Sequence, residues 1–499
     1  YEISECLVGS EMCIRDRRLI ELGIGYLSLD RSATTLSTGE RQRMQLARAV
    51  RNRTTGMLYV LDEPSIGLHP SNVEGLLGVM QDLISDGNSV VFVDHDLQVL
   101  RAADYLIEMG PGAGYNGGNI VALGNVDAIK NNQSSIIGRF LAGIEQTIIR
   151  DSIPEEHIFD NGYINIKTDR LYTVQPIDVN IPCGRLIAVT GVSGSGKTTI
   201  VLEELIPALE AQISERPLPA CIKTITNKTI KKIHLIDASP IGINVRSTVA
   251  TYSNILDDLR KIFASLPQSK EKGYKAADFS YNTGILRCKT CDGTGQISMD
   301  MQFLPDVDMV CPECKGSRYD KSVETLKFCP DKKTNEEGVS LSEIMGLTVE
   351  QALRLFAGNK KIYEKLNLLN NLGLGYLTLG ESTPALSGGE AQRLKLASEM
   401  DKPQNDALFV FDEPSIGLHP SDIRVLLMVF DRLVRNGATV MVIEHDLDII
   451  ANADYVIDMG PGGGEYGGRI VAAGTPQQIM ANPESVTGKY LSCELSKRK

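Results

Sequence analysis

The chain has 499 residues, ten cysteines, no tryptophan and a formal net charge of −12. This length predicts about two to four domains with enough apolar residues to bury a core in each. No apolar run approaches the roughly 20 residues needed to cross a bilayer, which excludes a membrane-embedded subunit. The acidic balance gives no general attraction to nucleic acid, so any DNA contact would depend on a local basic surface.

Residues 1–17 have no recognisable role in a folded domain, and we treat them as a non-native segment. Beyond them, the motif around Ser37 recurs around Ser387, and the same offset of 350 residues relates several later motifs. The chain therefore contains two related modules. Only one phosphate-binding loop accompanies them, so we expect the first module to begin in its middle and the chain to be truncated at its N-terminus.

The first module begins with Leu-Ser-Thr-Gly-Glu at residues 36–40, which places Ser37 and Gly39 at the start of a predicted helix. The first N–H groups of a helix have no internal partners and can bind an anion. A simple helix cap is the alternative interpretation. Thr38 stands where such motifs usually have glycine, a departure that could weaken binding.

Two predicted strands of the first module end in polar residues. Residues 57–61 form an apolar run that ends at Asp62 and Glu63, and the next apolar run ends near His95. Solvated strand ends are the ordinary interpretation of either feature alone. We place the first lobe at residues 18–130 and a connector at residues 131–161.

The phosphate loop lies in the second module. Residues 185–190 predict a strand, residues 191–198 read Gly-Val-Ser-Gly-Ser-Gly-Lys-Thr, and residues 199–205 have helical character. Backbone N–H groups of such a loop surround phosphate, Lys197 supplies charge to the terminal phosphates, and Thr198 can ligate Mg²⁺. A structural glycine turn is the alternative, which the strand-loop-helix context disfavours. The predicted nucleotide ligands are Gly191, Ser193, Gly194, Ser195, Gly196, Lys197, Thr198 and Thr199.

A long insertion, predicted at residues 206–370, separates this loop from the second copy of the serine-glycine motif, around Ser387. Within residues 288–314 it holds two Cys-x-x-Cys pairs, whose thiolates can present four sulfurs to a structural Zn²⁺. Reduced core thiols or a redox pair are the alternatives. Cysteines that bind metal rather than form disulfides favour a reducing compartment, and we expect a cytoplasmic protein. The predicted metal ligands are Cys288, Cys291, Cys311 and Cys314.

The rest of the second lobe, predicted at residues 162–205 and 371–499, repeats the first. Ser387 and Gly389 open a predicted helix, and an apolar run ends at Asp412 and Glu413. We expect Asp412 to hold Mg²⁺ and Glu413 to orient or deprotonate the attacking water. His445, at the end of the next strand, is expected to sense the γ-phosphate as a neutral imidazole. A structural histidine is the alternative.

Taken together, these motifs resemble the ATP-binding cassette family. In that family the signature of one module closes over nucleotide on the other module's phosphate loop. The resemblance implies an α/β fold with two ATPase lobes and two composite sites. One site is complete in this chain and combines Lys197, Thr198, Asp412, Glu413 and His445 with Ser37 and Gly39. The other combines Ser387, Gly389, Asp62, Glu63 and His95 with a phosphate loop upstream of Tyr1.

The insertion and its position make the chain similar to the C-terminal half of the UvrA family. The resemblance rests on Ser-Pro-Ile-Gly at 239–242, Arg-Ser at 246–247, Ala-Thr-Tyr at 250–252, and residues 303–307 and 314–319. It implies an ATPase that uses ATP, Mg²⁺ and Zn²⁺ to recognise damaged double-stranded DNA, a homodimer, and UvrB as a possible partner. A basic face of Lys223, Lys228, Lys231, Lys232, Arg260 and Lys261 could contact DNA, although such residues are more often a solvated surface.

Two positions depart from the family pattern. Ala238 stands where a glutamine is usual, and Ile243 stands where an arginine is usual. These departures leave open a UvrA-like paralogue for drug tolerance that does not bind UvrB. Rivals of another class are a ribosome-associated or a transport-type cassette ATPase, which the long insertion and the cysteine pairs fit poorly.

Overall fold

The computed structural model describes residues 19–28, 30–32, 34, 36, 38–50, 54–112, 117–145, 147, 150–151, 153–237, 241, 244–299, 307–329, 338–400 and 404–497. Ser37, Ala238 and Ile243, and the segment 1–17, lie outside these residues. The chain divides into two compact units. Unit 1 comprises residues 1–111, 117–237 and 403–499, and unit 2 comprises residues 112–116 and 238–402. No described helix is long and apolar enough to span a bilayer.

A six-stranded sheet forms the centre of the second lobe, in the order β15-β14-β7-β13-β12-β9. All neighbours are parallel except β14 and β15. Strands β7 and β13 are buried along their whole length because helices cover both faces of a parallel sheet. The strands are β7 (Leu186–Gly191), β9 (Lys232–Ile236), β12 (Ala407–Asp412), β13 (Thr439–Ile443), β14 (Tyr455–Gly460) and β15 (Arg469–Gly474).

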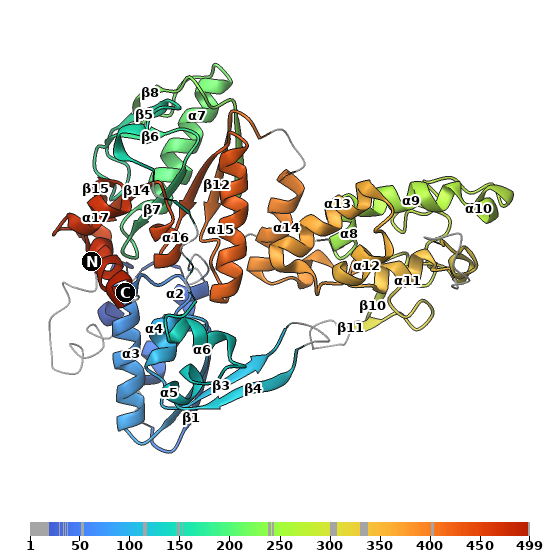
Figure 1. The fold of residues 1–499 in the computed structure, drawn as a ribbon, viewed down its shortest axis with the longest axis horizontal. Helices are drawn as coiled ribbons and strands as arrows, with labels where there is room; N and C mark the ends of the chain where they lie inside the picture. The colour runs from blue at the N-terminus through green and yellow to red at the C-terminus, as the bar shows by residue number, and fades with distance from the viewer. Residues whose placement is uncertain are drawn as a thin grey trace. The chain divides into compact units, whose positions relative to one another are not determined.

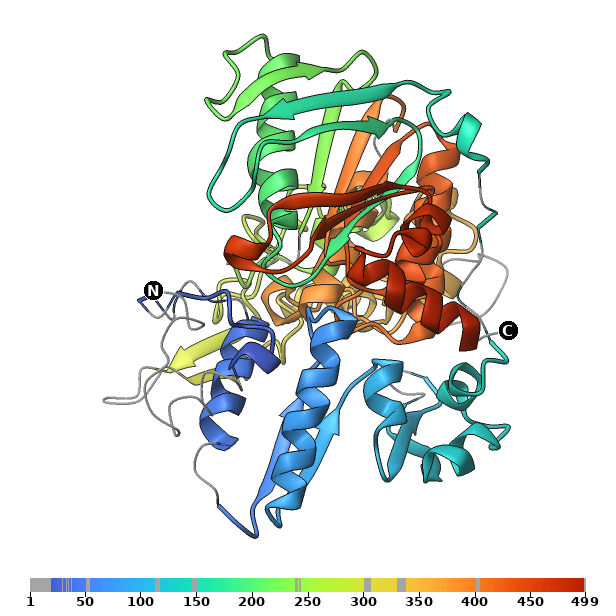
Figure 2. The same ribbon diagram turned by 90° about the vertical axis from the view of Figure 1, so that its left-hand side faces the viewer.

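Helices and a small antiparallel sheet cover this central sheet. After β7 the chain forms the π-helix η5 (Thr199–Leu205), which continues into α7 (Ile206–Ile213). Figure 2 shows the teal and green strands of the antiparallel sheet β6-β5-β8 beside α7. Its strands are β5 (Tyr163–Thr168), β6 (Asp178–Pro182) and β8 (Ile222–Thr226). The other elements of this lobe are η4 (Glu155–His157), α15 (Pro420–Arg435), α16 (Leu447–Ala451), η9 (Gly464–Tyr466), α17 (Pro476–Ala481) and α18 (Val486–Lys497).

The first lobe has two separate strand pairs. β1 (Leu58–Asp62) pairs in parallel with β2 (Ser89–Val93), and β3 (Leu106–Gly110) pairs antiparallel with β4 (Asn119–Gly124). Among the described residues no strand joins β2 to β3. Its helices are α2 (Thr38–Val50), α3 (Pro70–Ser85), α4 (Leu97–Arg101), α5 (Val126–Lys130) and α6 (Ile136–Leu141). Helix α3 packs against α18, which holds the first lobe to the second within unit 1.

Unit 2 is mainly helical (Figure 1). It contains both cysteine pairs, at residues 288–291 and 311–314. The antiparallel hairpin β10 (Gln296–Met299) and β11 (Val307–Val310) lies between the two pairs in sequence. The helices are α8 (Val249–Tyr252), α9 (Ile255–Ser265), α10 (Pro267–Glu271), η6 (Lys321–Thr325), α11 (Leu341–Gly346), α12 (Val349–Leu355), α13 (Lys360–Leu369), η7 (Asn370–Leu374), η8 (Thr383–Ala385) and α14 (Gly388–Met400).

The element boundaries differ in places from the sequence-based ones. α7, β8 and β9 precede the unit boundary at 237 and pack with the second lobe, although the insertion was expected to begin at 206. α6, expected in the connector, buries Ile137 and Leu141 in the same core as Leu106 of β3. The signature helix α14 belongs to unit 2. Apolar runs indicate that these segments are buried, but they do not specify which core buries them.

Candidate functional site

The phosphate loop connects β7 to the helical segment that begins at Lys197. Gly191, Gly194 and Gly196 all have positive φ, and a Cβ on Gly191 would lie 1.9 Å from the carbonyl oxygen of Met459. Only glycine fits this position without moving backbone. The hydroxyls of Ser193 and Ser195 are buried without a hydrogen-bond partner among the described residues. Buried polar groups normally have partners, so this loop offers unused donors to a bound phosphate.

Lys197 lies within the loop and is only 6% exposed. Its Nζ donates to the carbonyl oxygens of Gly191, at 3.0 Å, and Val192, at 2.9 Å. Burial lowers the pKa of Lys197 to about 8, against the opposing effect of the acidic residues Glu413, Asp458 and Asp412. The ammonium group is therefore held at the loop by neutral carbonyls, which phosphate oxygens would replace as stronger acceptors.

The predicted acid pair ends β12. Burial, together with the negative charges of Glu413 and Asp237, raises the pKa of Asp412 to about 6. Carboxylates that repel one another in this way form a suitable oxygen donor set for a divalent cation. The chemistry of Asp412 fits a divalent cation, and the Mg²⁺ roles of Asp412 and Thr198 stay predictions.

Glu413 adopts a strained backbone conformation with φ of 47°. A non-glycine residue in this left-handed region costs about 1–3 kcal/mol and is commonly found at functional sites. The N–H of Glu413 donates to the carbonyl oxygen of Ile443 at 3.0 Å, which fixes this conformation against β13. Burial raises the pKa of the Glu413 carboxyl, while the cations Lys197 and Arg43 lower it.

His445 follows β13 and faces Glu413, with Nε2 3.6 Å from Oε1. Burial, reinforced by Lys197 and Arg43, holds the pKa of His445 well below its usual range, so the imidazole is neutral. Its Nδ1 is buried and has no hydrogen-bond partner in the described part of the chain. The ring therefore keeps a polar group free for a ligand, as a phosphate sensor requires.

Sequence reasoning missed the residue that positions this loop, Glu444. Its carboxylate accepts from the N–H groups of Ser415 at 2.8 Å, His445 at 2.9 Å and Asp446 at 3.2 Å. The first lobe repeats the arrangement with Asp94, which accepts from the N–H groups of Ser65, His95 and Asp96. The signal that could have found Glu444 was an acidic residue at both repeated positions, 94 and 444.

The first lobe also repeats the acid and histidine geometry. Glu63 has a φ of 46°, and its Oε1 lies 3.9 Å from Nε2 of His95. Both side chains are about one-third exposed, whereas His445 is 8% exposed. Both lobes therefore form an acid–histidine pair; the histidine next to the phosphate loop is buried, whereas Glu413, at 31% exposure, is about as exposed as Glu63.

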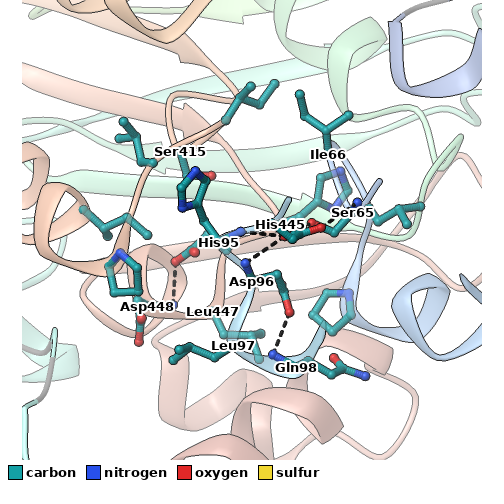
Figure 3. A pocket seen from close by; sticks show the side chains of 18 of the residues that line it. Ser65, Ile66, His95, Asp96, Leu97, Gln98, Ser415, His445, Leu447 and Asp448 are labelled. Carbon is teal, nitrogen blue, oxygen red and sulfur yellow. Dashed lines mark hydrogen bonds between the residues drawn. The ribbon is translucent and has the colours of Figure 1, made fainter. Parts of the chain in front are cut away.

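The two lobes meet at loops that follow the acid pairs. A Cβ on Gly67 would lie 3.2 Å from Oε2 of Glu413, and a Cβ on Gly417 would lie 3.1 Å from Oε1 of Glu63. The contacts are reciprocal, as expected for an interface between repeated modules. A cavity of about 160 Å³ lies at this interface, and Figure 3 shows its lining, with Ser65 and His95 from one lobe and Ser415 and His445 from the other.

Tyr26 of the first lobe lies directly against the phosphate loop. A Cβ on Gly194 would lie 2.6 Å from Cγ of the Tyr26 ring, and the Tyr26 hydroxyl donates to Oε1 of Glu40 at 2.6 Å. A substitution at Gly194 would therefore clash with the other lobe. The motif reading did not single out Tyr26, although Tyr376 repeats it at the same offset.

The two signatures lie in different units. In unit 1, a Cβ on Gly39 would lie 2.9 Å from the carbonyl oxygen of Ile66, so this position requires glycine. In unit 2, the Ser387 hydroxyl accepts from the N–H of Glu390 at 3.3 Å, and the Ser387 N–H donates to Oε2 of Glu390 at 2.6 Å. Ser387 is thus a helix cap in this state, and Gly389 lies in the first turn of α14.

The four predicted metal ligands form a compact buried cluster in unit 2. One ligand atom from each cysteine lies within 4.8 Å of the others. Against the opposing effect of burial, N–H groups of Cys314 and Glu313 lower the pKa of the Cys311 thiol to about 7. Gly293, which follows the first pair, has positive φ, and a Cβ there would lie 1.8 Å from the carbonyl oxygen of Tyr281. Four convergent sulfurs at this spacing fit a tetrahedral Zn²⁺.

Several residues of the predicted basic face are paired with carboxylates. Lys231 is paired with Asp406 at 2.7 Å and Lys223 with Asp169 at 2.6 Å, both in unit 1. Arg260, in unit 2, is paired with Asp257 at 2.8 Å. These carboxylates reduce the positive potential that DNA phosphates would encounter, and such pairings cannot be located from sequence because they depend on tertiary structure.

Comparison with known proteins identifies relatives over nearly the whole chain. UvrABC system protein A of Aquifex aeolicus (strain VF5) is 43% identical over 510 residues, which cover 99% of this chain and 54% of that protein. UvrABC system protein A of Bacillus subtilis (strain 168) is 44% identical over 492 residues, which cover 97% of this chain and 50% of that protein. The chain therefore spans about half the length of these curated relatives. No protein-family model matches it.

Solved structures agree with these relatives. The crystal structure of UvrA2 from Deinococcus radiodurans superposes with a TM-score of 0.88 at 39% identity and covers 97% of this chain and 57% of that chain. A structure of ribosome-bound archaeal Pelota and ABCE1 gives a TM-score of 0.52 at 18% identity, covering 94% of this chain and 63% of that chain. The second likeness shows the fold alone, an α/β fold with cassette-type ATPase lobes.

Proposed function

The chain belongs to the UvrA family, and from this premise we propose that it is an ATP-hydrolysing component of DNA-damage recognition. The observation that supports this function is the arrangement in unit 1. The phosphate loop, the acid pair and the neutral histidine of the second lobe lie together, and the Gly67 loop of the first lobe packs against Glu413. A site built across two lobes can couple ATP hydrolysis to movement of the lobes.

In the proposed mechanism, Lys197 and the loop N–H groups bind the β- and γ-phosphates, because phosphoryl transfer depends mainly on positioning and charge stabilisation. Glu413 orients the attacking water and accepts its proton, and His445 contacts the γ-phosphate. The strained backbone of Glu413 is held by β13, so the carboxylate is positioned before nucleotide binds. Asp412 and Thr198 would hold Mg²⁺, which supplies charge neutralisation at the phosphates.

We assign the remaining predicted ligands by their place in the same site. Ser193, Ser195 and Thr199 and the loop glycines contact phosphate, and Ser37 and Gly39 would complete the site from the first lobe. Glu63 and His95, with Ser387 and Gly389, would serve a second site that needs another phosphate loop. The proposed ligands of a structural Zn²⁺ are Cys288, Cys291, Cys311 and Cys314.

The proposed target is damaged double-stranded DNA, and the proposed assembly is a cytoplasmic homodimer able to bind UvrB. Support comes from the relatives at 43% and 44% identity, whose printed name places them in the UvrABC system. The ribosome-associated and transport-type rivals are not favoured, because the likeness to ABCE1 is limited to the fold. The 39% identity to UvrA2 keeps a paralogue as the second candidate.

The experiment measures DNA binding and ATP turnover of this chain on damaged and undamaged duplexes across a salt series. Binding through phosphate contacts should weaken steeply with salt, and the damaged duplex should bind more tightly in a nucleotide-dependent manner. A double change of Lys231 and Lys232 to glutamine should reduce the salt dependence if they touch the DNA backbone. Absence of binding under every condition would overturn the DNA function and leave an ATPase with an unknown target.

A further inference from the structure

One buried cation near the nucleotide site has no role in the mechanism above. Arg43 lies on α2, one turn after Gly39, and its side chain is only 4% exposed. Its Nε and Nη1 are buried and have no hydrogen-bond partner among the described residues. Removing a guanidinium from water without pairing it costs several kcal/mol, so a cation in this position requires a compensating negative charge.

The charged and titratable groups around Arg43 come from both lobes. A Cβ on Gly39 would lie 2.9 Å from the carbonyl oxygen of Ile66 and 3.9 Å from Nη2 of Arg43, and a Cβ on the next residue, Gly67, would lie 3.2 Å from Oε2 of Glu413. Burial lowers the pKa of Arg43, against the opposing charges of Tyr26 and Glu40 in the first lobe and Glu413 in the second. Glu40 is already engaged, because it accepts from the Tyr26 hydroxyl at 2.6 Å and lies 3.9 Å from Nη1 of Arg31. Glu413 is thus the acid with which the Arg43 guanidinium can interact across the lobe interface.

The charge of Lys197 also lowers the pKa of Glu413, but bound nucleotide would draw the Lys197 ammonium group toward the phosphates. In this structure Lys197 donates to carbonyls of the phosphate loop, and in the proposed mechanism it turns to the phosphates. Arg43 cannot be diverted in this way, because α2 holds it on the other lobe. It remains the cation facing Glu413 when the phosphates occupy Lys197.

We propose that Arg43 is a positioning residue that acts across the lobe interface by holding the Glu413 carboxylate in place to orient the attacking water. The inference rests on the proposed role of Glu413 and adds a requirement to it. Hydrolysis on the phosphate loop of the second lobe then depends on the signature helix of the first lobe through the charge of Arg43, in addition to any contact that Ser37 and Gly39 make. Arg43 thereby links lobe closure to the chemical step.

The repeat supplies a matched control. Arg393 occupies the position of Arg43 in the second signature helix, and its Nε and Nη1 are also buried without partners among the described residues. The sequence contains one phosphate loop, at residues 191–198, and Arg393 lies in the other compact unit. A change at Arg393 reproduces the chemistry of the Arg43 change on the equivalent helix of the repeat.

The test compares Arg43→Gln, Arg43→Lys and Arg393→Gln by kcat, KM and the equilibrium affinity for ATP, with thermal melting to confirm folding. Arg43→Gln should lower kcat about tenfold or more while ATP affinity stays within about twofold of wild type. Arg43→Lys should recover part of kcat, because it restores the charge without the planar fork. Arg393→Gln should leave kcat within about twofold. If Arg43→Gln does not fold, Arg43→Lys must still show reduced kcat at unchanged ATP affinity.

A double-mutant cycle with Glu413→Gln separates action through Glu413 from a general effect. In the Glu413→Gln background, Arg43→Gln should cause no further loss of single-turnover rate. Additive losses, wild-type kcat in Arg43→Gln, or weakened ATP binding with kcat preserved would each overturn the inference. Normal turnover in Glu413→Gln alone would instead overturn the proposed catalytic role, so the two failures are distinguishable.

Discussion

The two lobes of this chain share motifs and local structure, yet their strands are buried to very different extents. Val60 on β1 is 69% exposed, whereas Val410 at the same repeat position on β12 is fully buried. Ile107 on β3 is 61% exposed, and its equivalent Ile457 on β14 is 1% exposed. The strand pattern is therefore the same in both lobes, and burial is decided by what packs on the strands.

The difference has a structural source in β7 and the helices that follow it. In the second lobe β7 pairs with both β13 and β14 and joins all six strands into one sheet. In the described part of the first lobe β2 and β3 have no such strand between them, and the two pairs remain separate. Because β7 also carries the phosphate loop, the element that completes the core is the same element that binds nucleotide. Core completion and nucleotide binding are thus coupled in this fold.

The comparison predicts that the two acid positions contribute unequally to hydrolysis by this chain. Glu413→Gln should reduce ATP turnover about 100-fold or more with ATP binding retained, because the amide cannot accept the proton of water. Glu63→Gln should reduce it far less, since the phosphate loop at residues 191–198 belongs to the second lobe, as Glu413 does. Steady-state turnover and equilibrium nucleotide binding check both. Equal losses in the two variants would contradict the asymmetry.

A change in the phosphate loop should affect binding itself. Lys197→Ala should remove measurable ATP binding and with it turnover, because the terminal phosphates lose their point charge. Nucleotide affinity measured by fluorescence or calorimetry is the readout, and Glu413→Gln is the control that keeps binding. Retained affinity in Lys197→Ala would show that nucleotide is held elsewhere.

The cysteine cluster is a second difference between the lobes, because it lies in an insertion that interrupts the sequence of the second lobe. Elemental analysis should find one Zn²⁺ per chain for this cluster, and Cys288→Ser or Cys314→Ser should lose it with local unfolding, since thiolate ligation and folding are coupled. Cys493→Ser, at an exposed cysteine outside the cluster, is the control and should keep the metal. A folded wild-type protein without zinc would refute the assignment.

The sequence predicted the parts of the fold that depend on local pattern. The strand-loop-helix around Lys197, the strand ends at Asp412 and His445, and the convergence of the four cysteines are all present. It could not predict contacts made between lobes, such as Tyr26 against Gly194 or Gly67 against Glu413, because these depend on docking rather than periodicity. The role of Glu444 was missed for a similar reason: its partners are N–H groups of loops whose path is set by tertiary structure.

A matched pair of valines tests the burial difference directly. Val410→Ala should lower the free energy of unfolding by about 1.5–3 kcal/mol, because it removes buried methyl groups and leaves a cavity. Val60→Ala makes the same change at an exposed position and should cost less than about 0.5 kcal/mol. Chemical denaturation of both variants is the measurement. A large cost at Val60 would mean that its strand face is covered in solution.

The smallest expected effect concerns Glu204, a fully buried carboxyl on η5 whose two oxygens have no hydrogen-bond partner among the described residues. Burial, with a contribution from Glu203, raises its pKa to about 7. The folded state therefore favours the protonated form, and the stability linked to this group is present at low pH and lost as pH rises through about 7. Glu204→Gln stays neutral, so its stability relative to wild type should rise by about 1 kcal/mol or more between about pH 5 and about pH 8, since the cost of burying the amide is the same at both pH values and cancels from this difference. Thermal melting at the two pH values checks this, and an unchanged difference between the two proteins would show that Glu204 ionises without cost.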